Sequence, residues 1–268
     1  MEKIFELIRG RKSVRTFDGN PLSSEHLEAL KEYANGITNP FGIHVEFVFL
    51  DAKENGLSSP VLSGENLYVT GKVEKKPYSD VAFGYSFEDL VLYAWSLGIG
   101  TVFIGGTMKR ENFEKAAGLK ENEIMPCISP LGYPAKKKSV KEIMMRKGVG
   151  ADSRMSSEKL FFENEWENPL SVGDDMKDVF EAVRWAPSAV NKQPWRIILK
   201  DGIYHFYEKS DIGYKSDAVG DMQKIDIGIA LYHFTAALKE KGKTCEIEIK
   251  DPGLVTPGNV QYIASVKF

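Results

Sequence analysis

Apolar and polar residues follow two different periods along the chain, and the periods divide it into expected helices and strands. Apolar residues at helical spacing predict four amphipathic helices, at residues 5–9, 27–34, 110–117 and 179–186. Strict alternation predicts strands over 45–51 and 195–201. Two longer segments, 83–98 and 227–242, are apolar on almost every side, so we expect them to form helices buried all round.

The predicted elements occur twice in the same order. Helix, breaker-rich loop and strand over residues 27–51 recur about 150 positions later, over 179–201. The apolar helix at 83–98 matches 227–242 at a shift of 144 positions. This shift aligns two pairs of glycines, Gly84 with Gly228 and Gly98 with Gly242. The second pair stands at the ends of the two helices, where glycine commonly terminates a helix. The chain therefore contains an imperfect internal repeat.

The second copy is shorter than the first. A strand at 127–133 matches 262–268 at a shift of only 135 positions, so residues are missing before the last strand. The missing portion corresponds to a glycine-containing strand segment, 102–107, and the amphipathic helix that follows it in the first half. We therefore expect two related halves, residues 1–150 and 151–268, folded around one shared core, with neither half functional alone.

Composition narrows the functional classes. Of 268 residues, 43% are hydrophobic and 27% are charged, which is ordinary for a folded globular chain. The net charge of −3 supplies no positive field for a nucleic acid. No stretch approaches the roughly 18 apolar residues of a membrane span, and the first residues lack a secretory core, so we expect a cytoplasmic protein. Two isolated cysteines and four scattered histidines argue against a disulfide framework and a metal site.

The strongest local signal lies near the start of the chain. Arg11, Ser13 and Arg15 alternate with other residues, so an extended stretch would project all three to one side and Val14 to the other. Two guanidinium groups beside a hydroxyl suit a phosphate or a polyol. A basic helix end with structural salt bridges is the alternative interpretation.

Two further segments carry candidate chemistry. Ser188, Asn191 and Gln193 lie in a loop that prolines begin and end, and such neutral side chains can bind the edge of a heterocycle. The alternative is a rigid loop whose polar groups satisfy its own turn. Gly105 and Gly106 would let backbone amides approach a planar ring, although a paired glycine is also common in plain turns. The spacing is not that of a dinucleotide-binding Gly-x-Gly-x-x-Gly motif.

Taken together, five motifs resemble those of the nitroreductase family of FMN-dependent oxidoreductases, in its internally duplicated, Thermotoga-type branch. They are Arg-x-Ser-x-Arg-x-Phe at 11–17, Leu-Gly-Ile-Gly-Thr at 97–101, Phe-Ile-Gly-Gly at 103–106, Leu-Gly-Tyr-Pro at 131–134 and Ala-Pro-Ser-x-x-Asn-x-Gln-Pro-Trp at 186–195. The resemblance implies an α+β fold of three layers, α/β/α, with a mostly antiparallel sheet. It covers most of the chain, but the Pro-Ser loop stands in the second half instead of soon after the arginine motif.

The resemblance also assigns site residues. Arg11, Ser13 and Arg15, with Lys12 as a weaker candidate, would contact the phosphate, ribityl chain and pyrimidine edge of FMN. The loop would line the other side of the ring through Pro187, Ser188, Ala189, Asn191 and Gln193. Backbone amides of Ile104, Gly105 and Gly106 would approach flavin N5, with Gly105 nearest. Arg154 would hold the phosphate, with Arg146 and Lys147 as rivals, and no side chain need act catalytically.

In the ordinary family two subunits pair and each FMN lies between them. This chain resembles both subunits fused into a pseudo-dimer with one complete site. Residues 39–44 stand as a degraded copy of the Pro-Ser loop, and the second half lacks the arginine motif, so the mirror site is expected to have decayed. Tyr85, Phe103, Phe41 and Trp195 are candidates for an aromatic wall of the remaining site.

The implied function is hydride transfer from NADH or NADPH through flavin N5 to a nitroaromatic, a quinone or a similar flat acceptor. Two alternatives stay open: a family branch with another flavin reaction, such as dehalogenation, dehydrogenation or flavin breakdown, and a non-catalytic flavin-binding or nucleotide-binding protein. We expect a small-molecule acceptor, no membrane or nucleic-acid partner, and a monomer, since the chain is already a pseudo-dimer; a further homodimer stays open.

Overall fold

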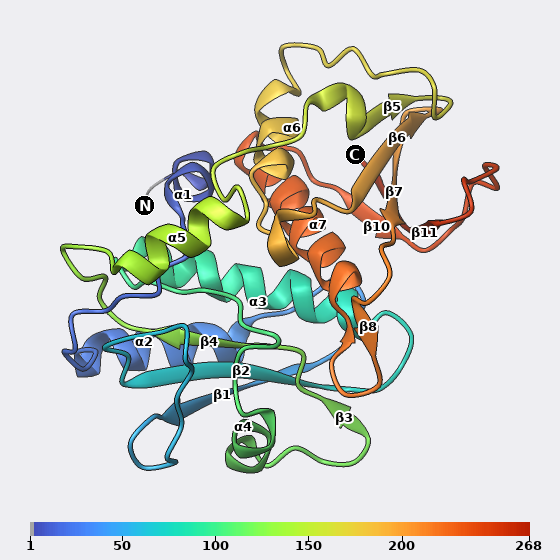
Figure 1. Ribbon diagram of the computed structural model, residues 1–268. Coiled ribbons are helices and arrows are strands. Elements are labelled where there is room, and N and C mark those ends of the chain that lie inside the picture. Colours follow the sequence, from blue (N-terminus) through green and yellow to red (C-terminus); the bar gives the residue numbers. More distant parts are fainter. Residues whose placement is uncertain (1–2) are drawn as a thin grey trace.

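A computed structural model describes residues 3–268, and its first half is built on a four-stranded antiparallel sheet (Figure 1). The central strand is β2 (Leu67–Glu74). It pairs with three others, β1 (Val45–Asp51), β3 (Glu123–Ile124) and β4 (Ile128–Leu131). Helices cover both faces, α2 (Ser24–Gly36) and α3 (Ser79–Ser96) on one and α4 (Arg110–Ala117) on the other. The first half therefore has helix, sheet and helix layers.

The second half carries its own five-stranded sheet. Its strand order is β10 (Glu246–Glu248), β11 (Val260–Lys267), β7 (Ile203–Lys209), β6 (Trp195–Lys200) and β5 (Phe161–Glu163). Only the edge pair β5 and β6 is parallel. Two helices accompany the sheet, α6 (Lys177–Arg184) and α7 (Met222–Glu240). A small hairpin, β8 (Lys215–Ser216) and β9 (Gly220–Asp221), leads directly into α7.

Short helical segments lie before, between and within these units. They are the helices α1 (Ile4–Gly10) and α5 (Val140–Gly148) and the 3-10 turns η1 (Ser157–Lys159) and η2 (Ala189–Asn191). The α5 helix belongs to the connection between the two halves, as its position in Figure 1 shows. No helix within residues 3–268 is both long and apolar enough to cross a membrane.

The two apolar helices, α3 and α7, cross at the centre of the molecule (Figure 1). Both are buried along most of their length, which explains why their sequences show no polar face. Gly98 and Gly242 follow their ends with φ of 75° and 73°, a left-handed conformation that favours glycine as a helix stop. The predicted pair of buried helices is confirmed, and each extends four or five residues further toward its start than the pattern indicates.

The contact between α3 and α7 has a near two-fold symmetry. A Cβ on Gly84 would lie 2.0 Å from the carbonyl oxygen of Ile225, and one on Gly228 would lie 2.1 Å from that of Val81. Gly228 lies 144 positions after Gly84, and Ile225 lies 144 positions after Val81. Each glycine therefore admits the backbone of the other helix, as in an interface between two identical subunits.

Buried polar pairs repeat the same symmetry. The Asp89 carboxylate accepts a hydrogen bond from the Tyr232 hydroxyl at 2.7 Å. The Glu88 carboxylate lies 2.8 Å from Nε2 of His233. A shift of 144 positions converts one pair into the other, because Glu88 corresponds to Tyr232 and Asp89 to His233. The internal repeat is thus expressed in atomic contacts as well as in sequence.

The structure confirms the α+β class, the antiparallel pairing and the duplicated arrangement, with one local correction. The sequence pattern predicts a strand over residues 102–107, but these residues make only single bridges to neighbouring segments, such as Ile104 with Ile128. The main apolar core is continuous from Leu7 to Val266 and includes residues of both halves. The boundary between the halves near residue 150 stays a prediction.

Candidate functional site

A cavity of about 590 Å³ lies where the two halves meet, and we call it the interface cavity. The first half contributes the segment after α1 and residues near 102–105, and the second half contributes the loop at 187–191 and one side of α7. The connection between the halves contributes α5 and residues 149–154. Its volume suits a ligand of cofactor size, since such sites usually measure roughly 300–1,000 Å³.

Most of the predicted site residues line this cavity. They are Arg11, Lys12, Ser13, Arg15, Gly105, Arg154, Pro187, Ser188, Ala189 and Asn191, together with the rival Arg146. Three others do not line it: Ile104, Gly106 and Gln193. Ile104 and Gln193 are buried in packed surroundings, whereas Gly106 has open space beside it. The structure thus brings together residues from distant parts of the chain, such as Arg11 and Ser188.

The arginine segment has the extended geometry that its alternation predicts. Ser13 forms a parallel bridge with Thr101, and the Val14 amide donates to the Thr101 carbonyl at 2.9 Å. Val14 points away from the cavity, is 4% exposed and packs against Gly100, where a Cβ would lie 2.8 Å from it. Pairing with the segment around Thr101 therefore fixes which side chains face the cavity.

Arg11 is held at the base of the cavity by a buried acid. Its side chain is 5% exposed, and its Nε lies 3.7 Å from the Glu88 carboxylate. Glu88 in turn contacts Nε2 of His233, whose Nδ1 lies 2.8 Å from the Ala182 carbonyl and must donate to it. Burial lowers the pKa of Arg11, and Glu88 partly offsets this effect. The arginine is thus positioned by two central helices before any ligand binds.

Positive charge accumulates around the cavity. Burial is the main cause of the lowered pKa of Arg15; Glu142 partly offsets it, and the Arg146 guanidinium adds to it. The pKa of Arg154 falls to about 10, chiefly through burial and then through repulsion by Arg11. Arg154 stacks on Trp185, with 4.7 Å between Cζ and the ring centre. Burial and mutual repulsion both disfavour these charges, and an anion in the cavity would relieve the cost.

Within residues 3–268, three arginines of the cavity wall also carry a buried donor without a partner. The buried Nε atoms of Arg11, Arg15 and Arg154 have no hydrogen-bond partner in the described part of the chain. A buried donor without a partner is costly, and a guanidinium group is well shaped for a phosphate or a carbonyl edge. A flat ligand carrying a phosphate fits this donor set, so the residues present fit the FMN that the resemblance implies.

The loop at 187–194 differs from its predicted role in one respect. The Ser188 hydroxyl accepts from the Gln193 amide at 2.9 Å, and Gln193 Oε1 accepts from the Met155 amide at 2.9 Å. Asn191 Nδ2 donates to the Gly150 carbonyl at 2.8 Å. The sequence predicts that these side chains bind a heterocycle, but their hydrogen bonds hold the loop to itself and to the connection. The rigid-loop alternative therefore describes Gln193 better.

Backbone strain marks the same loop. Val190, Asn191 and Gln193 have φ of 50°, 58° and 51°, in the left-handed region that side chains with a Cβ rarely adopt. Such strain persists only where surrounding contacts enforce it, and it concentrates at functional sites. One enforcing contact comes from Asp226 of α7, whose two carboxylate oxygens each lie 3.1 Å from the Ala189 amide. The loop is thus locked against the cavity wall.

The Gly105 peptide is held from behind by Arg110. Arg110 Nη2 donates to the Gly105 carbonyl at 2.6 Å, and its Nη1 donates to the Met125 carbonyl at 2.5 Å. A Cβ on Gly105 would lie 2.5 Å from Cε of Met222, so a larger residue here would displace the end of that side chain. Arg110 thus fixes the carbonyl of Gly105, and Gly105 itself lines the cavity.

Sequence reasoning missed several residues that line the cavity. Trp185, Cys127, Met222 and Asp226 are among them, and of the proposed aromatic wall only Phe103 is present. Tyr85, Phe41 and Trp195 lie elsewhere. Asp226 is buried, and this burial raises the pKa of its carboxyl well above the usual range. A carboxyl immediately before the apolar segment 227–242 was the signal that could have revealed it.

Comparisons with known proteins identify relatives in sequence and in fold. The model of the family described as "Putative TM nitroreductase" matches residues 3–238. A crystal structure of a protein titled a putative nitroreductase, from Thermotoga maritima, superposes with a TM-score of 0.63 at 20% identity, covering 99% of this chain and 93% of that one. An FMN-dependent nitroreductase from Clostridium difficile gives a TM-score of 0.42 at 17% identity, covering 53% of this chain and 94% of that one.

Among curated sequences, the "Putative NAD(P)H nitroreductase acg" of Mycobacterium tuberculosis is 30% identical over 96 residues. The match covers 35% of this chain and 28% of that protein. The chain therefore spans under a third of the length of the curated relative that it matches.

Proposed function

Because the chain belongs to this nitroreductase family, we propose that it is an FMN-dependent oxidoreductase that uses NADH or NADPH to reduce a flat acceptor such as a nitroaromatic or a quinone. One observation carries the proposal. Three guanidinium-bearing residues from two distant segments of the chain, Arg11, Arg15 and Arg154, line one interface cavity of about 590 Å³. They supply the donors that a flavin phosphate and a pyrimidine edge require.

The residues divide the work of holding the cofactor. Bound FMN would supply the hydride-transfer chemistry at N5, and the protein would supply binding, orientation and electrostatics. Arg154, held on Trp185, would bind the phosphate, and Ser13 would donate to or accept from the ribityl chain. Arg11 and Arg15 would place positive charge beside the pyrimidine edge, where reduction adds negative charge.

The opposite wall supports orientation. Arg110 fixes the Gly105 carbonyl, and the Gly105 amide, on the cavity wall, would face the N5 side of the ring. Asp226 locks the 187–194 loop, whose small residues leave a flat face against which a donor and then an acceptor can stack. Val102 and Phe103 add apolar surface that excludes water. None of these steps needs a nucleophilic side chain or a general base.

The test is the flavin content and electron transfer of purified protein. We expect about one FMN per chain after incubation with FMN, reduction of its absorbance by NADH or NADPH, and reoxidation by a nitroaromatic or a quinone. Protein that takes up no FMN would contradict the proposal at its first step. Bound FMN that neither dinucleotide reduces would instead favour a flavin-binding protein without this activity.

A further inference from the structure

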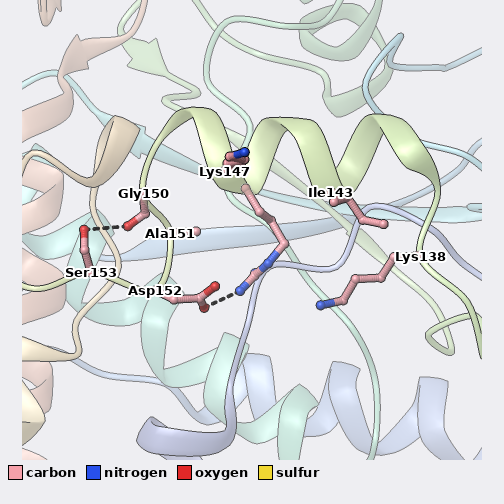
Figure 2. A pocket seen from close by; sticks show the side chains of 8 residues that line it. Lys138, Ile143, Lys147, Gly150, Ala151, Asp152 and Ser153 are labelled. Carbon is pink, nitrogen blue, oxygen red and sulfur yellow. Dashed lines mark hydrogen bonds and ion pairs between the residues drawn. The ribbon is translucent and has the colours of Figure 1, made fainter.

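A second pocket lies next to the interface cavity and shares part of its wall (Figure 2). We call it the α5 pocket; it measures about 420 Å³ and is lined by Lys138, by one side of α5 and by residues 150–153. Arg146, Ala151 and Asp152 are among the residues that line both spaces. The α5 pocket is therefore adjacent to the interface cavity, with these residues between the two spaces.

The α5 pocket carries an excess of positive charge. Its walls hold Lys138, Arg146 and Lys147 but a single carboxylate, Asp152. Arg146 pairs with Asp152, and the Arg146 side chain is 12% exposed whereas the Asp152 side chain is 81% exposed. Figure 2 shows Lys138 on the side before α5 and Asp152 on the turn after it. The positive charges of the pocket lining thus outnumber its one carboxylate, which suits an anionic group.

The pocket is held in a fixed position relative to the cavity. Asn191 of the 187–194 loop donates to the Gly150 carbonyl at 2.8 Å, and the Ser153 hydroxyl donates to the same carbonyl at 2.8 Å. These bonds tie the floor of the pocket to the wall of the interface cavity. At the rim, Ile143 is 53% exposed and offers apolar surface to a sugar or a base. The arrangement suits an anion attached to a larger organic molecule.

The guanidinium groups proposed to hold FMN are separate from this pocket. Arg11, Arg15 and Arg154 line the interface cavity and not the α5 pocket, whereas Lys138 and Lys147 line the pocket and not the cavity. Two anionic groups can therefore be bound at once, one in each space. A hydride donor that stacks in the cavity and carries its own phosphates would supply the second.

We infer that the α5 pocket binds a phosphate of the nicotinamide dinucleotide donor, through Lys138, Lys147 and Arg146. The inference rests on the proposed function, because it takes NADH or NADPH as the donor. The pyrophosphate, common to both dinucleotides, and the 2′-phosphate, present only in NADPH, have the same chemistry at this site. The experiment therefore has to separate the two sources.

The test is the double variant Lys138→Ala/Lys147→Ala, loaded with FMN. We expect KM for NADPH to rise about tenfold or more, because charge-assisted hydrogen bonds are lost. A rise for NADPH alone assigns the 2′-phosphate, and a rise for both dinucleotides assigns the pyrophosphate. Lys137→Ala is the matched control, since this exposed lysine belongs to the same run but does not line the pocket. We expect it to leave KM unchanged.

A donor without phosphates separates this inference from the proposed function. Reduction by 1-benzyl-1,4-dihydronicotinamide should proceed equally in the parent protein and the double variant. 2′-Phospho-ADP-ribose and ADP-ribose carry the phosphates without a reacting ring. Their affinities, measured by calorimetry, should fall in the double variant in the same pattern as KM rises. If neither NADH, NADPH nor 1-benzyl-1,4-dihydronicotinamide reduces FMN bound to the parent protein, that result would count against the proposed function.

Two results would overturn the inference itself. One is a double variant that binds FMN and keeps its KM for both dinucleotides and its affinity for both ribose compounds. The other is a loss of FMN affinity with unchanged donor KM, which would assign the α5 pocket to the flavin phosphate. Either result leaves the proposed oxidoreductase function standing.

Discussion

The interface cavity beside α7 can be compared with the equivalent position beside α3, because the two helices are related by a shift of 144 residues. Three α7 residues that line the cavity are Met222, Asp226 and Ile229. The equivalent residues around α3 are two aromatics and a small side chain: Tyr78, Ala82 and Tyr85. At the α3 position, the rings of Phe41 and Tyr78 stack in parallel with their centres 6.0 Å apart. Aromatic side chains thus stand where the other copy keeps a cavity.

The loops that face these helices are anchored by different chemistry. On the cavity side, the buried carboxylate of Asp226 accepts from the Ala189 amide. On the other side, Asn39 closes its own loop, accepting from the Phe41 amide at 3.1 Å and donating to Ser86 at 3.1 Å. The neutral amide of Asn39 costs less free energy to bury than a carboxylate does. The comparison teaches that one copy kept a costly polar wall, while the other became ordinary packing.

The largest expected effect comes from the glycines that both copies share. Gly84→Ala and Gly228→Ala would place a Cβ 2.0 Å and 2.1 Å, respectively, from a backbone oxygen of the other helix. Because backbone cannot move aside as a side chain can, each variant should lose about 3 kcal/mol of unfolding free energy or more. Chemical denaturation measures this loss. Equal losses would support the symmetric helix pair, and a small loss in either variant would contradict it.

A matched control exists for this pair. Gly36 ends α2, and a Cβ placed on it would have no heavy atom within 4 Å and would meet no positive φ. Gly36→Ala should therefore be neutral or should stabilise the protein by up to about 1 kcal/mol. A destabilisation comparable to that of Gly84→Ala would mean that alanine at helical glycines is harmful for a reason other than the close approach.

The second prediction concerns the copy that kept the cavity. Arg11→Ala should weaken FMN binding by about 1.5–3 kcal/mol, since a charged hydrogen-bond donor is lost, and Arg15→Ala should have a similar effect. Fluorescence titration of FMN with each variant measures the change. Lys31→Ala is a useful control, because this exposed lysine of α2 does not line the cavity. Unchanged FMN affinity in both Arg11→Ala and Arg15→Ala would remove the arginine segment from the site.

The third prediction uses acids near the start of α7. Burial is the first cause that raises the pKa of Glu208 to about 7, and Asp221 and Asp80 add to it. A carboxyl whose pKa is raised in the folded state stabilises the fold below its unfolded value, near 4.5, and this stability is lost as the pH rises through about 7. Glu208→Gln should therefore reduce the loss of stability across this pH range by about 2 kcal/mol, since solvent screening lowers the full effect of the shift.

Denaturation curves from below to above this range test the third prediction. Glu28→Gln, in α2 on the outside of the molecule, is the matched control for the substitution itself. The two copies differ in charge here, because Lys224 of α7 stands at the position equivalent to Asp80 of α3. A pH profile that Glu208→Gln does not alter would show that charge at this end of the helices has no part in the difference between the two copies.

The smallest effect is expected at the aromatic pair beside α3. Phe41→Ala should cost about 1 kcal/mol of stability, because the ring is only partly buried and stacks on one neighbour. It should leave FMN affinity and the flavin-to-protein ratio unchanged. Thermal unfolding and flavin quantification provide the two measurements. An increase toward two flavins per chain would show that this position still binds the cofactor once the ring is removed.

Much of the fold follows from patterns that physics constrains strongly. The all-round apolar segments predict α3 and α7, because a helix without a polar face must be buried. The alternation of Arg11, Ser13 and Arg15 predicts which side chains face the cavity, since an extended segment has a period of two. The missing segment of the second half also agrees with the structure: within the described residues, α4 has no helical counterpart between α7 and β11.

The remainder of the site could not be predicted for identifiable reasons. Gln193 and Ser188 belong to a motif, but a polar side chain in a turn can serve its own backbone or a ligand, and the sequence does not distinguish them. Trp185 and Trp195 look alike in sequence, yet one lines the cavity and the other is completely buried in the core. The fold of the connection decides which space is faced by Arg146, Lys147 and Arg154. The sequence of this segment has no periodic pattern that would predict this fold.

The connection between the halves has a consequence for how such a chain can change over evolution. A linker that only joins two units tolerates insertions, because its length matters little. Here α5 and residues 149–154 also form walls of the interface cavity and of the α5 pocket. An inserted or deleted residue would displace Arg146 or Arg154 from a wall. The conformation of the segment that joins the halves is therefore constrained, as well as its length. We expect related chains to differ in this segment by substitutions and not by insertions or deletions.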